Sequence, residues 1–173
     1  MKKLLTLIVV VGGVNLCQAQ NFSASMTSTQ EVPPNNLTGT DGTYGFADFT
    51  LNGNTLSVSA AFYGNSVGDP TVITVDDAPP GFNATGPLFD LTINNDETVV
   101  NGGLIDGSFT GSGTLTPQQV TDLNNGDLYV NLQTSTMPQG EVRGQITAVP
   151  EPGTMTLMCV GSLSWLAARR KKV

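Results

Sequence analysis

Three turn-like segments of this chain bring carboxylate and amide side chains close together. They are Asp76-Asp77, Asn94-Asn95-Asp96-Glu97 and Asn124-Asn125-Gly126-Asp127. Calcium takes about six to eight oxygen ligands, often loop carboxylates and backbone carbonyls. The candidate calcium ligands are therefore Asp76, Asp77, Asp96, Glu97 and Asp127. None follows the EF-hand spacing, and Asn, Asp and Gly also form ordinary solvated turns, so both interpretations stay open; no other cofactor is expected.

Arg143 is the single cation among residues 20–148, which carry thirteen acids and hence a net charge of −12. A strand through this region would place Glu141 and Arg143 on one face. We predict a structural ion pair of Arg143 with Glu31, beside Glu141, that ties the first strand to the last. A surface with this much negative charge repels phosphate backbones and anionic lipid headgroups. Nucleic acid is therefore not an expected partner.

The missing residue types exclude most catalytic chemistry. The chain has no histidine, and all its lysines and both cysteines (Cys17 and Cys159) lie near the termini, outside residues 20–148. Without them there is no Ser-His-Asp triad, no thiolate or imidazole metal site, and no Schiff base or disulfide in that stretch. A hydrolase with two facing carboxylates remains conceivable, but the acids are scattered and no aromatic-rich cleft can be discerned. We expect no enzyme.

Both ends of the chain read as targeting segments. Residues 1–19 have a basic start, an apolar run and small residues before a cleavage site after Ala19, as in a signal peptide. Residues 149–173 begin with Val149, Pro150, Glu151 and Pro152 and continue with an apolar run from Thr154 to Ala168. They end in four cations, Arg169, Arg170, Lys171 and Lys172, which would hold that end on the cytoplasmic side of a membrane. As a helix, the apolar run would reach about 22 Å, short of a ~30 Å bilayer core, which favours a transient sorting tail over a permanent membrane helix.

Residues 20–148 between these segments read as one β domain. Apolar residues alternate with polar ones in the first segment, where Phe22, Ala24 and Met26 define one face. Further strands are predicted at 43–51, 55–63, 71–75, 88–93, 104–110, 127–134 and 141–147. One short helix is predicted after Thr116, which offers an N-cap followed by proline. About eight strands with frequent turns favour an all-β, antiparallel, Greek-key-like β-sandwich with one short helix.

The aromatic residues of this domain mostly fall on alternating strand positions, where they would fill the core. Phe82, in a Pro/Gly-rich loop, is the one expected to be exposed. The domain has no tryptophan, so a sugar-binding site lacks its usual platform.

The C-terminal segment closely resembles the PEP-CTERM sorting signal, on the strength of Val149-Pro150-Glu151-Pro152, the apolar stretch and the terminal basic cluster. The resemblance implies a Gram-negative bacterium, export through the inner membrane with signal peptidase and exosortase as processing partners, and tail removal near the Pro-Glu-Pro. The protein would touch the membrane only through the tail before processing. It would then reach the cell surface or the extracellular space, often with exopolysaccharide and biofilm growth.

The domain resembles the CHRD family. Gln30-Glu31-Val32-Pro33-Pro34 is similar to its opening motif, residues 126–134 to its "G-x-x-Y-V-N" pattern, and Gly140 to Ile146 to its closing "GE-x-RGQI". Relatives usually carry a His-x-His in the strand before a Gly/Pro-rich loop and a later histidine, where this chain has Ile73-Thr74-Val75 and Gln133. A copper site of the superoxide dismutase kind is therefore not expected.

The two resemblances together imply a non-catalytic surface or matrix protein, with extracellular polysaccharide or matrix proteins as partners. A calcium-dependent adhesion module using the acidic loops is the alternative, and a carboxylate-based hydrolase the third.

Overall fold

The computed structural model describes residues 19–34, 43–64, 70–94 and 105–150. Over these residues it confirms an all-β, antiparallel fold with one α-helix. The strands are β1 (Gln20–Met26), β2 (Tyr44–Asn52), β3 (Thr55–Gly64), β4 (Pro70–Asp77), β5 (Pro87–Asn94), β6 (Ile105–Thr114), β7 (Leu128–Thr134), β8 (Val142–Gln145) and β9 (Thr147–Ala148). A 3₁₀ turn, η1 (Ser28–Gln30), follows β1, and α1 (Pro117–Asn125) precedes β7.

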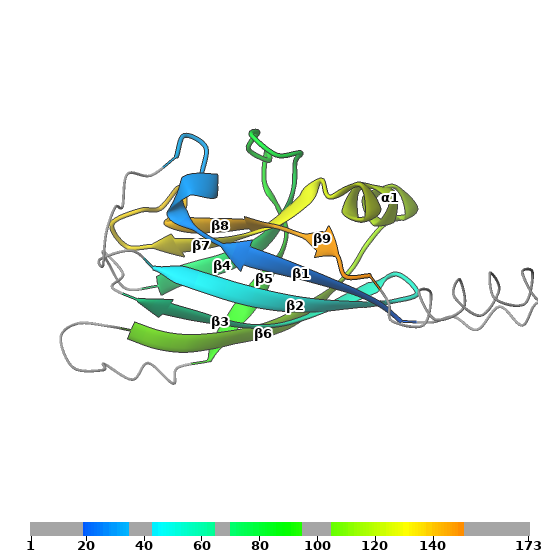
Figure 1. Ribbon diagram of the computed structural model, residues 1–173, viewed down its shortest axis with the longest axis horizontal. Helices are drawn as coiled ribbons and strands as arrows, with labels where there is room; N and C mark the ends of the chain where they lie inside the picture. The colour runs from blue at the N-terminus through cyan, green and yellow to red at the C-terminus, as the bar shows by residue number, and fades with distance from the viewer. Residues whose placement is uncertain (1–18, 35–42, 65–69, 95–104, 151–173) are drawn as a thin grey trace, which may run out of the picture.

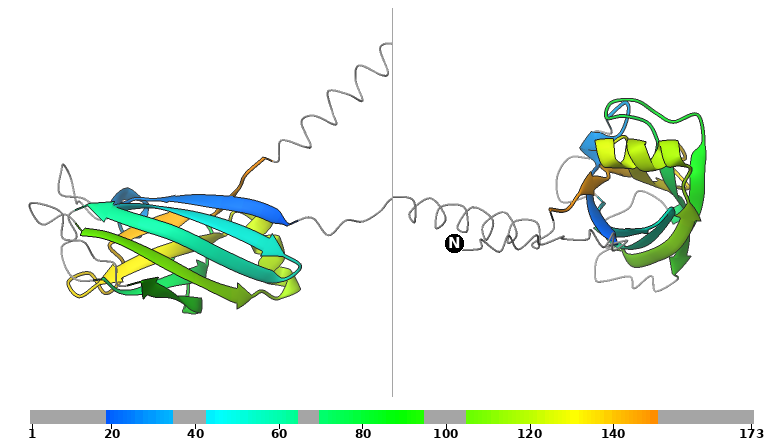
Figure 2. Two further views of the ribbon diagram at one scale, coloured as in Figure 1. Left: turned by 90° about the horizontal axis from the view of Figure 1, so that it is seen from below. Right: turned by 90° about the vertical axis from the view of Figure 1, so that its right-hand side faces the viewer.

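The nine strands form one continuous sheet that is nearly closed. The strand order is β8-β7-β4-β5-β6-β3-β2-β1-β9. Just past the end of β1, Thr27 pairs with Arg143 of β8, so the two ends of the sheet meet. The views in Figures 1 and 2 show this curl, with α1 lying at one end of the barrel. The two layers expected of a β-sandwich are therefore parts of one sheet that curls round on itself.

The core fills the interior because the strands alternate buried and exposed residues with a period of two. In β2 the alternation is complete: Ala47, Phe49 and Leu51 are buried, while the residues between them face outward. Phe62 and Phe109 stack in the interior with ring centroids 6.3 Å apart. Gly53 turns the β2–β3 hairpin with a φ of 60°, a value that glycine adopts without strain.

The helix α1 begins as predicted. Thr116 Oγ1 accepts a hydrogen bond from the Gln119 backbone N–H, and Gln119 Oε1 accepts one from the Thr116 N–H, which together form a capping box. Leu123 anchors the helix in the core, and Gly126 ends it with a φ of 80°.

Two loops lie over the outside of the barrel on the same side, above β7 and β8 (Figure 1). One is the 28–34 loop, which includes η1, and the other is the 78–86 loop between β4 and β5. Asn83 Nδ2 donates to the Val32 carbonyl at 2.7 Å and ties the two loops together. They cover polar side chains on the outer face of the sheet.

The predicted signal peptide and most of the sorting tail, with its cations Arg169, Arg170, Lys171 and Lys172, lie outside the described residues. Ala19 is exposed directly before β1, and Val149 and Pro150 are exposed directly after β9. Among the residues that the structure does describe, no helix is long and apolar enough to cross a membrane.

Candidate functional site

A layer of polar residues covers the outer face of β4, β7 and β8. Two rows of three residues cross the strands β4, β7 and β8. The first row is Thr74, Asn131 and Arg143, and the second, two residues away along each strand, is Asp76, Tyr129 and Gln145. Because side chains alternate across a strand, all six share the face that points away from the core. The loops bury most of them: Thr74, Asp76, Tyr129, Asn131 and Arg143 are at most 6 % exposed.

Arg143 is the centre of this layer. Its guanidinium donates to the Phe82 carbonyl at 2.7 Å, to Asn83 Oδ1 at 3.4 Å and to Gln145 Oε1 at 3.2 Å. It also stacks over the Tyr129 ring, with Cζ 3.4 Å from the ring centroid. Arg143 therefore holds the 78–86 loop against the sheet.

Glu31 enters the layer from the 28–34 loop and packs against Gly140. Burial raises the pKa of its carboxyl to about 7; the charge of Arg143 acts in the opposite direction, and that of Asp76 adds to the rise. The predicted partners Arg143 and Glu31 are both buried and lie near enough for their charges to interact, and Glu141 is buried as well. The hydrogen bonds of the guanidinium nevertheless go to Phe82, Asn83 and Gln145, and Glu31 Oε1 has no hydrogen-bond partner. Glu141 accepts a hydrogen bond from Thr43 Oγ1.

Asp76 and Gln145 complete the layer. Burial raises the pKa of the Asp76 carboxyl, while the hydrogen bond that it accepts from Thr74 Oγ1 at 2.5 Å acts to lower it. Gln145 Nε2 donates to the carbonyls of Gly126 at 2.7 Å and Ala78 at 3.2 Å, and its backbone N–H donates to Gln30 Oε1 at 3.1 Å. These amide contacts fix the edges of both loops.

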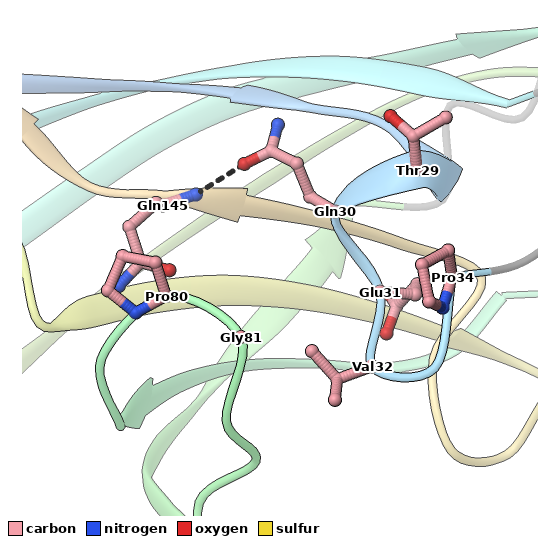
Figure 3. Close-up of a pocket in the computed structure, with 8 residues that line it drawn as sticks. All are labelled: Thr29, Gln30, Glu31, Val32, Pro34, Pro80, Gly81 and Gln145. Atoms are coloured by element: carbon pink, nitrogen blue, oxygen red, sulfur yellow. Dashed lines mark hydrogen bonds between the residues drawn. The ribbon is translucent and has the colours of Figure 1, made fainter.

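A cavity lies on each side of the 78–86 loop. The larger, of about 350 Å³, opens between the two loops and is lined by Gln30, Glu31, Val32, Pro80 and Gln145 among others (Figure 3). The second, of about 220 Å³, is more polar and includes Asp76, Tyr129, Asn131 and Gln133. The layer offers the carboxyls of Glu31 and Asp76 and several side-chain amides to a ligand.

Among the candidate calcium ligands that the structure describes, Asp77 and Asp127 lie near each other, whereas Asp76 points to the opposite face of β4. Asp76 faces the buried polar layer, whereas the carboxyl of Asp77 has a pKa raised by burial and by the nearby charges of Asp122 and Asp127. Asp96 and Glu97 lie outside the described residues. Within the four described segments, no cluster of three or more His, Cys, Asp or Glu side chains is placed to hold a metal ion.

A second candidate site lies on the outer face of β2 and β3, and the prediction for its aromatic residues was wrong. Tyr44, Phe46 and Tyr63 are 48 %, 56 % and 37 % exposed and do not fill the core. Tyr44 lies directly opposite Tyr63 in the register, with ring centroids 5.8 Å apart, and 6.2 Å from Phe46. Phe82 is 65 % exposed, as predicted.

These rings border a shallow groove. It has a volume of about 380 Å³ and is floored by small side chains, because Ala61 and Ser108 lie in line with Phe46 across β3 and β6. Asp48 and Ser59 face each other one pair further along. We call this surface the aromatic groove; it is lined by Phe46, Asp48, Ser59, Ala60, Ala61, Tyr63 and Ser108, and Tyr44 lies at its edge beside Phe46 and Tyr63. It offers ring faces for stacking and oxygens for hydrogen bonds.

The sequence did contain a signal for the groove. Phe49 and Leu51 alternate in phase with Ala47, which fixes the inward face of β2. Phe46 is out of phase with them and in phase with Asp48 and Thr50, so it has to point outward.

Two family models match the chain. The model described as CHRD domain covers residues 22–146, and the model described as PEP-CTERM protein-sorting motif covers residues 148–171. No curated protein and no solved structure matches. The first match runs from Phe22 in β1 to the residue after β8 and includes both the buried polar layer and the aromatic groove, and the second begins at the last residue of β9.

Proposed function

The chain belongs to the CHRD domain family and carries a PEP-CTERM sorting motif, and from this premise we propose that it is an exported, exosortase-processed, non-catalytic protein that binds extracellular polysaccharide. The PEP-CTERM motif supports export towards the cell surface of a Gram-negative bacterium and processing by an exosortase. The polysaccharide is that of the surrounding matrix or biofilm. Matrix proteins are the other class of partner.

The observation that carries the proposal is the aromatic groove. Sugar rings present flat C–H faces and rims of hydroxyl groups, so they pair with aromatic ring faces flanked by hydrogen-bonding oxygens. Tyr44, Phe46 and Tyr63 supply the ring faces, and Asp48, Ser59 and Ser108 supply the oxygens. Three neighbouring exposed aromatics on one face of a sheet also form an apolar patch, and such patches mark binding surfaces.

The position of the groove in the barrel fits a surface protein. Gln20 pairs with Leu51 and Phe22 with Ala148, so both processed ends leave the barrel at the same end. Tyr44 lies at the other end of β2, seven residues from Leu51, which corresponds to about 23 Å along a strand. The groove therefore lies away from the end that the tail would hold at the membrane.

The net charge of the domain limits which classes of polysaccharide it can bind. With a net charge of −12 for residues 20–148 and Asp48 in the groove, the protein repels anionic polymers. The expected ligand is a neutral polysaccharide or one with ammonium groups, which also stack on aromatic rings.

Co-sedimentation of the processed protein with purified exopolysaccharide of the producing bacterium tests the proposal. We expect binding by the wild type and a loss of up to about tenfold for Phe46→Ala and for Tyr63→Ala, since each removes a stacking ring worth about 0.5–1.5 kcal/mol. Phe82→Ala is the matched control, because it removes an exposed aromatic ring outside the groove and should leave binding unchanged. Equal binding by all three variants would refute the proposal.

Calcium-dependent adhesion is the second candidate function, and one observation favours testing it. The carboxyls of Asp122 and Asp127 lie close enough to Asp77 for their charges to raise its pKa. Repeating the sedimentation with millimolar calcium and with a chelator decides it: binding lost with the chelator would favour this candidate. A carboxylate-based hydrolase, the third, would release reducing sugar ends in the same assay.

A further inference from the structure

Two buried oxygens that lack hydrogen-bond partners face the same point beside Gly140. They are Glu31 Oε1 and Asn131 Oδ1, the buried side-chain polar atoms for which the described part of the chain provides no partner. A Cβ added to Gly140 would lie 2.6 Å from the first and 2.7 Å from the second, so both converge on one small region. Glu31 and Asn131 are 5 % and 6 % exposed, which leaves bulk water little access.

An amide oxygen can only accept a hydrogen bond, and so can an ionised carboxylate. Two such acceptors buried together leave both desolvated without compensation, and their partial charges repel each other. A carboxylic acid removes both problems, since its O–H is a donor and the carbonyl of the amide is its acceptor. A single hydrogen thus satisfies both atoms.

We propose that the neutral acid form of Glu31 donates its hydrogen to Asn131 Oδ1 and so latches the 28–34 loop onto the outer face of β7. Release of this proton to solvent leaves a carboxylate facing the amide oxygen and loosens the loop. The latch goes beyond the proposed function, because it involves none of the residues of the aromatic groove.

The charged and titratable groups around Glu31 agree with this assignment. Arg143 of β8 favours the ionised form, whereas Asp76 of β4 disfavours it, and burial outweighs both. The charge of Glu31 adds to the raised pKa of Tyr129 of β7. Glu141, which follows Gly140 in the chain, is also buried. The pKa of Glu31 therefore lies at about 7, against its ordinary 4.5.

The sign of the pH dependence follows from this direction. The folded chain holds the proton more tightly than the unfolded chain, so folding is favoured most below the ordinary pKa of about 4.5. The stability contributed by the latch is then lost as pH rises through the folded-state pKa of about 7. Because the 28–34 loop forms one wall of the 350 Å³ cavity, ionisation would widen that cavity (Figure 3).

The direct test is a carbon NMR titration of the Glu31 carboxyl in the processed wild-type protein. The latch predicts a midpoint near neutral pH, and an ordinary midpoint near about 4.3 would overturn it. The melting temperature is measured in parallel, and should fall by several degrees between about pH 5.5 and about pH 8.5.

Two variants separate the latch from other sources of pH dependence. Glu31→Gln keeps a donor for Asn131 Oδ1 without a titrating proton, so the fall in melting temperature should disappear or be much reduced. The control Asp48→Asn removes an exposed acid of the groove and should retain the fall. A fall of equal size in Glu31→Gln would overturn the proposal. So would recovery of the wild type at high pH on adding sodium or calcium chloride, because a cation would then be the missing partner.

Discussion

At the scale of single residues, Arg143 shows how far the sequence leads. Its isolation among acids indicated a buried structural role, and its burial together with Glu31 and Glu141 agrees with that. The sequence could not reveal that the guanidinium donates to the Phe82 carbonyl and the Asn83 side chain. Backbone carbonyls in a loop leave no compositional signal, so these contacts appear only once the loop folds back over the sheet.

Replacing Arg143 should therefore weaken the fold. Arg143→Leu removes the donors to Phe82, Asn83 and Gln145 and leaves Glu31 without its nearby positive charge. We expect a loss of about 3 kcal/mol in the free energy of unfolding, measured by urea denaturation. Asn83→Ala removes the longest of these bonds and the hydrogen bond from Asn83 to the Val32 carbonyl, and should cost less, about 1 kcal/mol for each bond. An Arg143→Leu variant as stable as the wild type would show that the polar layer does not depend on this residue.

The aromatic residues give the opposite lesson at the same scale. Phe46 and Phe49 lie three positions apart in one strand, so they must face opposite sides of the sheet. Residue type alone places both rings in the core, whereas their positions along the strand allow only one of them to point inward.

At the scale of elements, alternation and turn chemistry were enough to place the strands and the helix. The predicted strand over 43–51 corresponds to β2, and the predicted cap at Thr116 begins α1. The order of strands in the sheet was not predictable, because the neighbours of β4 are β5 and the distant β7. Such pairing depends on the packing of the whole domain and leaves no local pattern.

The strand β6 provides a test of the packing between elements. A Cβ at Gly107 would lie 2.2 Å from the Phe62 ring, and one at Gly113 would lie 2.2 Å from the Phe89 ring. Gly107→Ala and Gly113→Ala should each lower the free energy of unfolding by about 1–3 kcal/mol through overpacking. Gly86→Ala, where a Cβ meets nothing within 4 Å, is the control and should change it little. If all three variants denature at the same urea concentration, β6 does not pack as closely as described.

At the scale of the whole molecule, the arrangement of the two ends gives the barrel a direction. The Val149 N–H donates to the Asn21 carbonyl at 2.9 Å, so the start of the sorting motif lies beside the start of β1. Tyr44, Phe46 and Tyr63 lie towards the far end of β2 and β3. A protein held by its tail would thus present the aromatic groove outward before release. The 28–34 loop would face the same way, because it follows the end of β1 that lies farthest from the tail.

The measurement that tests the central claim most directly is NMR mapping of the processed protein titrated with oligosaccharides from the exopolysaccharide of its own bacterium. If the aromatic groove binds polysaccharide, the largest shift changes will fall on Tyr44, Phe46, Tyr63 and their neighbours Ser59 and Ser108. The resonances of Phe82 and of the buried polar layer should stay in place. Shift changes centred on the 78–86 loop or on the turn at Asp77, or none at saturating sugar, would contradict the account.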